Sequence, residues 1–138
     1  MAAELEVVLK QLTIAVPSYN VEKTLEATLS SLCVSEVLPE LDIIVVDDGS
    51  KDGTAKIAEG FACRYPESVC VIRKENGGHG SAVNTGIDAA QGRYFKVVDG
   101  DDRLDRDGLS GHGFSGRRFW RGFLAGFGHA YTGRELVF

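Results

Sequence analysis

Three acidic side chains, Asp99, Asp101 and Asp102, lie within four consecutive residues, directly after the apolar run 94–98. Carboxylates this close repel one another, so a folded protein seldom keeps them together without a cation. Their oxygens suit a divalent metal such as Mg²⁺ or Mn²⁺, which commonly binds phosphates as well. An EF-hand calcium loop is excluded, because Arg103 stands at its third ligand position. The cluster predicts a site for a metal and a phosphorylated ligand.

A second acidic pair, Asp47 and Asp48, closes the apolar run 41–46 and is followed by a Gly-Ser turn. One of these carboxylates can accept hydrogen bonds from a nucleobase or a ribose, while the glycine lets a ligand approach. The competing interpretation is an ordinary turn with a helix cap supplied by Ser50 or Asp52. Both interpretations stay open on this segment alone.

The segment 17–20 follows the first apolar run of the chain. Tyr19 has an aromatic face that can stack on a base, and Ser18 can hydrogen-bond it. Alternatively, the segment is a plain strand-to-helix connection in which Pro17 stops the strand and Asn20 caps the helix.

A glycine-rich stretch, residues 75–80, precedes a third helix and can offer backbone N–H groups to a phosphate. It is not a dinucleotide-binding fingerprint, because Val83 stands where the last glycine is needed, and no G-x-x-x-x-G-K-[ST] sequence occurs in the chain. Arg73 and Lys74 can meet a diphosphate, although such side chains are more often simply solvated. We expect His79 to be a solvent-facing loop residue.

Apolar runs and helical spacings alternate through the first hundred residues. They predict strands at 12–16, 41–46, 69–72 and 94–98. They predict helices at 21–32, around Ile57 and Phe61, and at 81–90. This alternation is typical of a mostly parallel sheet with helices on both faces, a Rossmann-like α/β fold. Ligands of such sheets bind beyond the carboxyl ends of the strands. Each of the four polar segments follows one of the predicted strands, so all four are expected at this edge.

The chain has 138 residues, enough for one domain with a sizeable core, and a net charge of −5. That charge argues against nucleic-acid binding, since no broad basic face could neutralise a phosphate backbone. Three cysteines, whose spacing fits no zinc or redox motif, favour a reducing, cytoplasmic compartment. The sequence has no apolar run long enough for a transmembrane segment, so we expect membrane association only through partners.

The composition changes after about residue 109. Residues 110–138 are rich in glycine, arginine and aromatic side chains without a clear period, and they predict no secondary structure. We therefore divide the chain into a ligand-binding part, residues 1–109, and an atypical tail, residues 110–138. A foreign, frameshifted or truncated end is favoured slightly over a genuine irregular segment.

In order and spacing, these motifs resemble the family 2 glycosyltransferases of GT-A fold. The resemblance rests on Val-Pro-Ser-Tyr-Asn at 16–20, Val-Val-Asp-Asp-Gly-Ser at 45–50, Asn-Gly-Gly at 76–78 with Asn-Thr-Gly at 84–86, and Val-Asp-Gly-Asp-Asp at 98–102. It covers roughly residues 10–105 and is specific, because several motifs agree in order. It implies that residues 1–109 are the nucleotide-sugar-binding GT-A half of such an enzyme, truncated after that half.

The resemblance also implies a ligand, a nucleotide-diphosphate sugar with a UDP-sugar favoured. Tyr19 would stack on the nucleobase, Pro17 and Ser18 would line its pocket, and Asp48 would accept hydrogen bonds from the base.

At the other end of the ligand, Asp99 and Asp101 would contact the nucleotide-sugar. Asp101 and Asp102 would hold Mg²⁺ or Mn²⁺, with Asp99 as the alternate ligand. The metal would neutralise the leaving diphosphate as the bond to the anomeric carbon breaks, usually with inversion.

The family's catalytic base normally lies in a second half that builds the acceptor site, and no matching acidic motif follows Asp107. We therefore expect a donor-binding half that transfers sugar to a saccharide or lipid acceptor poorly or not at all. The competing function is a non-catalytic nucleotide-binding or partner-binding module.

Overall fold

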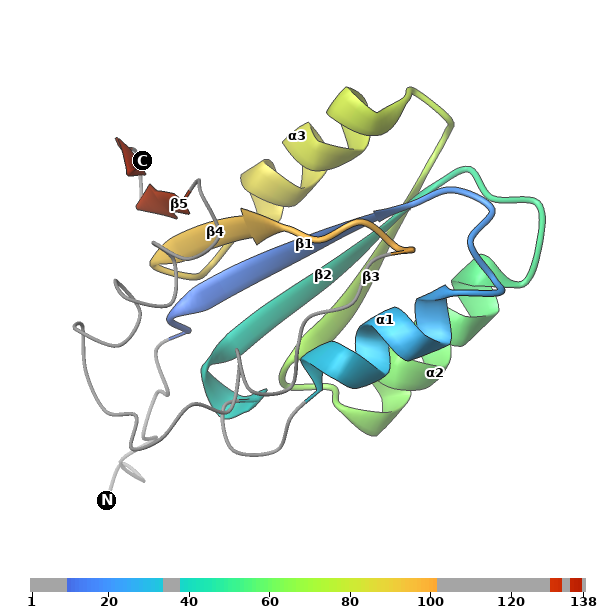
Figure 1. Cartoon of the computed structure of the whole chain (residues 1–138), viewed down its shortest axis with the longest axis horizontal. Helices are drawn as coiled ribbons and strands as arrows, with labels where there is room; N and C mark the ends of the chain where they lie inside the picture. Colours follow the sequence, from blue (N-terminus) through green and yellow to red (C-terminus); the bar gives the residue numbers. More distant parts are fainter. Residues whose placement is uncertain (1–9, 34–37, 102–129, 133–134, 138) are drawn as a thin grey trace, which may run out of the picture.

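The structure, a computed structural model of the chain, describes residues 10–33, 38–101, 130–132 and 135–137. One twisted sheet forms its centre, with strand order β3-β2-β1-β4-β5-β6 (Figure 1). The first four strands run parallel to one another. They are β1 (Leu12–Ser18), β2 (Leu41–Asp48), β3 (Val69–Lys74) and β4 (Tyr94–Val97). The prediction of a Rossmann-like α/β fold with a mostly parallel sheet is confirmed.

All four predicted strands are present, but β1, β2 and β3 each continue two residues further than predicted, and β4 ends one residue earlier. The expectation that Pro17 stops the first strand is wrong, because Pro17 pairs with Val46 in the register of β1 and β2. A proline has no N–H group to donate. On the β4 side of β1 this removes no hydrogen bond from the sheet, because β4 pairs with β1 only as far as Ala15.

The three predicted helices are also present, as α1 (Leu25–Leu32), α2 (Thr54–Arg64) and α3 (His79–Ala89), and a short 3-10 helix, η1 (Leu38–Glu40), precedes β2. Asn20 is not the N-cap of α1 as expected. It has a φ of 51° and lies before the helix, whose N-cap is Thr24. An asparagine tolerates this left-handed conformation better than most residues, because its short amide can hydrogen-bond nearby backbone.

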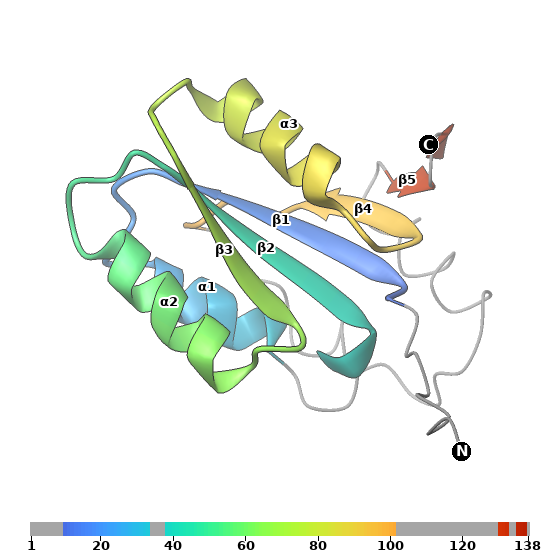
Figure 2. The same ribbon diagram turned by 180° about the vertical axis from the view of Figure 1, so that it is seen from behind.

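The two faces of the sheet are covered unequally. Helices α1 and α2 lie on one face and α3 lies on the other, as the two opposite views in Figures 1 and 2 show. Alternate residues of a strand point to opposite faces, so neighbours in β2 belong to different cores. Ile43 and Val45 join the larger cluster under α1 and α2, whereas Ile44 and Val46 join a smaller cluster with Ala82 of α3.

Two short strands in the tail were not predicted. β5 (Ala130–Thr132) pairs antiparallel with β4, and β6 (Glu135–Val137) pairs antiparallel with β5. The tail therefore contributes to the same sheet as the first hundred residues. Within the described residues, no helix combines the length and apolar character needed to cross a membrane.

Two helix-interior glycines differ in the space around them, which gives a matched test of the packing. A Cβ at Gly86 of α3 would lie 2.7 Å from the Cβ of Ala15 in β1, whereas a Cβ at Gly60 of α2 would meet nothing within 4 Å. We expect Gly86→Ala to lower the free energy of unfolding by about 1–3 kcal/mol, because α3 must move off the sheet. We expect Gly60→Ala to raise it by about 0.5–1 kcal/mol, through helix propensity alone.

Urea unfolding followed by circular dichroism measures both changes. Equal effects of the two substitutions would contradict the close contact between α3 and β1.

Candidate functional site

A pocket of about 360 Å³ opens at the carboxyl ends of β1 and β2, beside the first turns of α3. Its lining comes from three segments far apart in the sequence: Pro17, Ser18, Tyr19, Asp48, Asn76, Gly78, His79 and Ala82. The structure thus brings together four of the predicted site residues, those in segments 17–19 and 48. This position beyond the strand ends is the one that parallel sheets generally use for ligands.

Tyr19 and Ser18 line this pocket in different ways. Tyr19 is 48% exposed, so much of its aromatic ring is accessible to a ligand. Ser18 is buried, and its hydroxyl donates to the carbonyl oxygen of Val16 at 3.1 Å. A ligand can therefore reach the face of Tyr19, while the proton of the Ser18 hydroxyl is already used inside the protein.

The Asp48 carboxylate holds the glycine-rich loop in place. Its Oδ1 accepts from the backbone N–H of Gly77 at 2.9 Å and from Lys74 Nζ at 2.8 Å. Its Oδ2 accepts from the backbone N–H of Gly78 at 3.0 Å. A carboxylate has about four acceptor positions, so these three donors leave room for about one more, on Oδ2.

These contacts also set the charge of Asp48, which is only 4% exposed. Burial raises the pKa of its carboxyl group, but the hydrogen bonds from Lys74, Gly77 and Gly78 and the charge of Lys74 outweigh it. The net result is a pKa below the ordinary value of 3.8. Asp48 therefore stays ionised, as an acceptor only, at neutral pH.

Asp47 faces away from this loop and serves the turn after β2. Its Oδ1 accepts from the backbone N–H of Ser50 at 3.0 Å, and its Oδ2 lies 3.7 Å from Nε of Arg73. Asp52 Oδ1 accepts from the N–H of Thr54, the first residue of α2, but the N-cap of this helix is Gly53, so the expectation that Ser50 or Asp52 is the N-cap is wrong. Of the two adjacent aspartates, only Asp48 lines the pocket.

The loop that carries Tyr19 is fastened to the turn after β2. The backbone N–H of Asn20 donates to Ser50 Oγ at 3.0 Å, and its Oδ1 accepts from the backbone N–H of Lys51 at 2.9 Å. The N–H of Val21 donates to Thr54 Oγ1 at 2.9 Å. These bonds fix the two residues that follow Tyr19, Asn20 and Val21.

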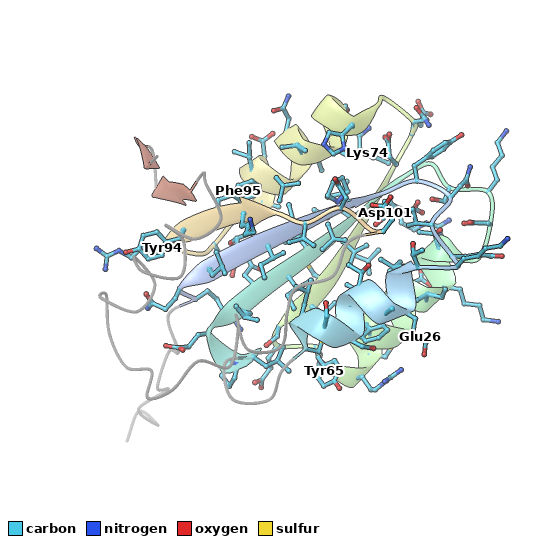
Figure 3. All side chains as sticks on the ribbon, viewed as in Figure 1. Glu26, Tyr65, Lys74, Tyr94, Phe95 and Asp101 are labelled. Carbon is cyan, nitrogen blue, oxygen red and sulfur yellow. The ribbon has the colours of Figure 1, made fainter. Side chains whose placement is uncertain are left out.

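The acidic segment lies next to the same pocket. Gly100 donates its N–H to the carbonyl oxygen of Pro17 at 3.3 Å, and Asp99 Oδ1 lies 3.7 Å from Nδ1 of His79. Asp101 is exposed, and Figure 3 shows it with Lys74 at the end of the sheet opposite Tyr94. The predicted metal ligand Asp102 lies outside the described residues.

Asp99 and Asp101 carry the hard carboxylate oxygens that suit a metal, although neither residue is among those that line the pocket. In the part of the chain that the structure describes, no group of three or more His, Cys, Asp and Glu side chains is placed to hold a metal ion. Mg²⁺ usually takes only one or two carboxylates and completes its octahedral shell with phosphate oxygens and water. Hard oxygen donors beside a ligand pocket match that pattern.

Several pocket residues were not among the predicted site residues. Asn76 and Gly78 belong to the loop expected to approach a phosphate, but nothing local predicts that Asp48 binds this loop. His79 faces solvent as expected, with a side chain 65% exposed, but it is the first residue of α3 and not a loop residue, and it lines the pocket. The signal was its place after two glycines, since Gly78 at φ 93° is what turns the chain into α3.

Comparison with known proteins identifies the family of this arrangement. The family model described as glycosyl transferase family 2 matches residues 13–111. The uncharacterised glycosyltransferase EpsJ of Bacillus subtilis is 47% identical over 90 residues, which are 65% of this chain and 26% of EpsJ. Glycosyltransferase GlyA of Streptococcus pneumoniae is 35% identical over 97 residues, 70% of this chain and 14% of GlyA.

Solved structures give the same result. The mannosyltransferase PcManGT from Pyrobaculum calidifontis, in complex with GDP-Man and Mn²⁺, matches with a TM-score of 0.66 and 28% identity over 72% of this chain and 30% of its own. TarS of S. aureus, in complex with UDP-GlcNAc, matches with a TM-score of 0.63 and 31% identity over 72% of this chain and 29% of its own. The match thus spans less than a third of each of these relatives.

The lowered pKa of Asp48 predicts an acid-sensitive contribution to stability. Because the pKa is lower in the folded state, this contribution is complete above the unfolded pKa and is lost as the pH falls below that value and through the folded pKa. We expect Asp48→Asn to lower the free energy of unfolding at pH 7 by about 1–3 kcal/mol, since charged hydrogen bonds are lost. The difference from wild type should shrink at acid pH.

Urea unfolding at neutral and acid pH measures this difference. Asp88→Asn, at an exposed position of α3, is the matched control. A difference between wild type and Asp48→Asn that does not change with pH would contradict stabilisation by hydrogen bonds to the charged Asp48 carboxylate.

Proposed function

Because the chain belongs to glycosyl transferase family 2, we propose that it binds a nucleotide-diphosphate sugar in the pocket between β1, β2 and α3. The observation that carries this proposal is the pocket itself. There the exposed ring of Tyr19 lies beside the buried, ionised Asp48 and a glycine loop. An aromatic face and a carboxylate acceptor are two features that a nucleobase can use.

We assign the base of the nucleotide to the end of the pocket near Tyr19. Stacking would use the Tyr19 ring, Pro17 and Ser18 would line the pocket beneath the base, and the remaining acceptor position of Asp48 Oδ2 would accept from a base N–H group. UDP-sugar is the favoured donor, since uracil carries such an N–H and TarS was solved with UDP-GlcNAc. PcManGT was solved with GDP-Man, so GDP is the second choice.

We assign the diphosphate to the end near Asp99 and Asp101. Asp101 and Asp102, with Asp99 as the alternate ligand, would bind it through Mg²⁺ or Mn²⁺, and PcManGT was solved with Mn²⁺. When bound, the metal neutralises the charge that develops on the leaving diphosphate. The residues of this chain would orient the donor, so that the oxygen of an acceptor hydroxyl attacks the anomeric carbon as the bond to the diphosphate breaks, with inversion.

The reaction also needs an acceptor and a general base, and we assign neither of them to the described residues. A base must lie within hydrogen-bond reach of the acceptor hydroxyl to take its proton, and we assign none among the described residues. The acceptor is proposed to be a saccharide or a lipid, and the location to be cytoplasmic. We therefore propose that residues 1–109 act as the donor-binding half of the enzyme.

Isothermal calorimetry of the chain with UDP, GDP and UDP-GlcNAc tests the base end of the site. We expect Tyr19→Ala to weaken UDP binding about tenfold, because one base–aromatic stack is lost. Tyr19→Phe keeps the ring and should bind as wild type does. Absence of binding to every one of these nucleotides would remove the proposed function, and equal binding by Tyr19→Ala would remove the assignment of the base.

The same measurement with Mn²⁺ or with a chelator tests the diphosphate end. We expect Mn²⁺ to strengthen UDP binding by wild type, and we expect Asp101→Asn to abolish that gain, because an amide is a poorer ligand for a hard cation. Glu26→Gln, an exposed acid on α1, is the control. A gain from Mn²⁺ that persists in Asp101→Asn would exclude Asp101 as a ligand.

A further inference from the structure

Two threonine hydroxyls of α1 donate to one backbone oxygen, the carbonyl oxygen of Gly100. Oγ1 of Thr24 and Oγ1 of Thr28 each lie 3.0 Å from it. Gly100 stands between Asp99 and Asp101 in the chain. Helix α1 therefore holds the acidic segment at its middle residue.

The side chain of Thr28 is an unusual choice at its position. It is 1% exposed and lies on the buried face of α1, which otherwise consists of Leu25, Leu29 and Leu32. Valine has nearly the same shape and no polar atom, and a buried hydroxyl is costly unless it makes a hydrogen bond. The hydroxyl is closer to the Gly100 carbonyl oxygen than to its other acceptor, the Thr24 carbonyl oxygen at 3.2 Å.

Thr24 is likewise used for something other than its usual role. It is the N-cap residue of α1, where a threonine oxygen normally accepts from an N–H of the first turn. Its side chain makes no such cap bond. Instead its hydroxyl is nearest to the Gly100 carbonyl oxygen, at 3.0 Å against 3.3 Å for the carbonyl oxygen of Val21.

Gly100 is held on its other side as well. Its N–H donates to the carbonyl oxygen of Pro17 at 3.3 Å. A Cβ at this position would lie 2.9 Å from Ser18 Oγ and 2.9 Å from Val21 Cγ2, so the residue is pressed against the connection between β1 and α1. A residue fixed at its nitrogen and at its oxygen sets the starting points of the two side chains that flank it.

We propose that Thr28, assisted by Thr24, is a positioning residue for the acidic segment. Through Gly100 it keeps Asp99 and Asp101 where they can bind the metal and the diphosphate of the donor, so this role rests on the proposed function. Neither threonine is among the described residues that line the pocket, and so neither contacts the base there. The two hydroxyls should therefore affect metal-dependent binding and leave the base end unchanged.

Amide exchange of the ligand-free chain, followed by NMR, tests the positioning without any ligand. We expect Thr28→Val to speed exchange of the Gly100 N–H about three- to tenfold, since one hydrogen bond that holds this residue is lost. Thr28→Ser keeps the hydroxyl and should restore the wild-type rate. Thr85→Val is the control, because Thr85 Oγ1 donates only within α3, to the Ser81 carbonyl oxygen at 3.0 Å. Unchanged exchange of Gly100 in Thr28→Val overturns the proposal.

Calorimetry with UDP, with and without Mn²⁺, tests the consequence for the site. We expect the gain in UDP affinity from Mn²⁺ to fall about three- to tenfold in Thr28→Val, while binding without metal stays as in wild type. Thr28→Ser and Thr85→Val should keep the full gain. An unchanged gain in Thr28→Val, or an equal loss with and without Mn²⁺, overturns only the positioning role, whereas a wild-type chain that binds no UDP overturns the proposed function too.

Discussion

The pairing of β1 with a parallel strand on each side is the constraint on which the rest of the structure depends. Every residue of β1 is buried, and its register with β2 and β4 leaves no freedom to slide, because a shift of one residue would exchange its two faces. The carboxyl ends of these strands must then lie together. The polar segments that follow them meet for that reason, although they lie up to about eighty residues apart in the chain.

Where these segments meet, they supply one another's hydrogen-bond partners. Asp48 binds the loop after β3, Asn20 binds the turn after β2, and Thr28 binds the segment after β4. No buried side-chain nitrogen or oxygen in the described part of the chain is left without a hydrogen bond. The loops that build the pocket are thus held by hydrogen bonds to one another. This lowers the entropy that is lost when they bind a ligand.

Much of this could be predicted from sequence, because the signals were local. Continuous apolar runs identified the four parallel strands, and helical spacings identified the three helices between them. The rest depended on contacts between distant residues. Pro17 looks like a strand end until its register with β2 is known, and Asn20 looks like a cap until its φ is known. β5 pairs with β4, and β6 pairs with β5. The bond from Thr28 to Gly100 spans 72 residues.

The hydrogen bonds between Asp48 and the glycine loop limit which substitutions can change the nucleotide preference of the site. The same carboxylate that we assign to the base also holds the backbone of Gly77 and Gly78. A substitution there changes two properties at once, the recognition of the ligand and the wall that encloses it. New nucleotide preferences are therefore more accessible through Tyr19 or Asn76, whose side chains can vary while the loop keeps its anchor. We therefore expect Tyr19 and Asn76 to vary more readily than Asp48.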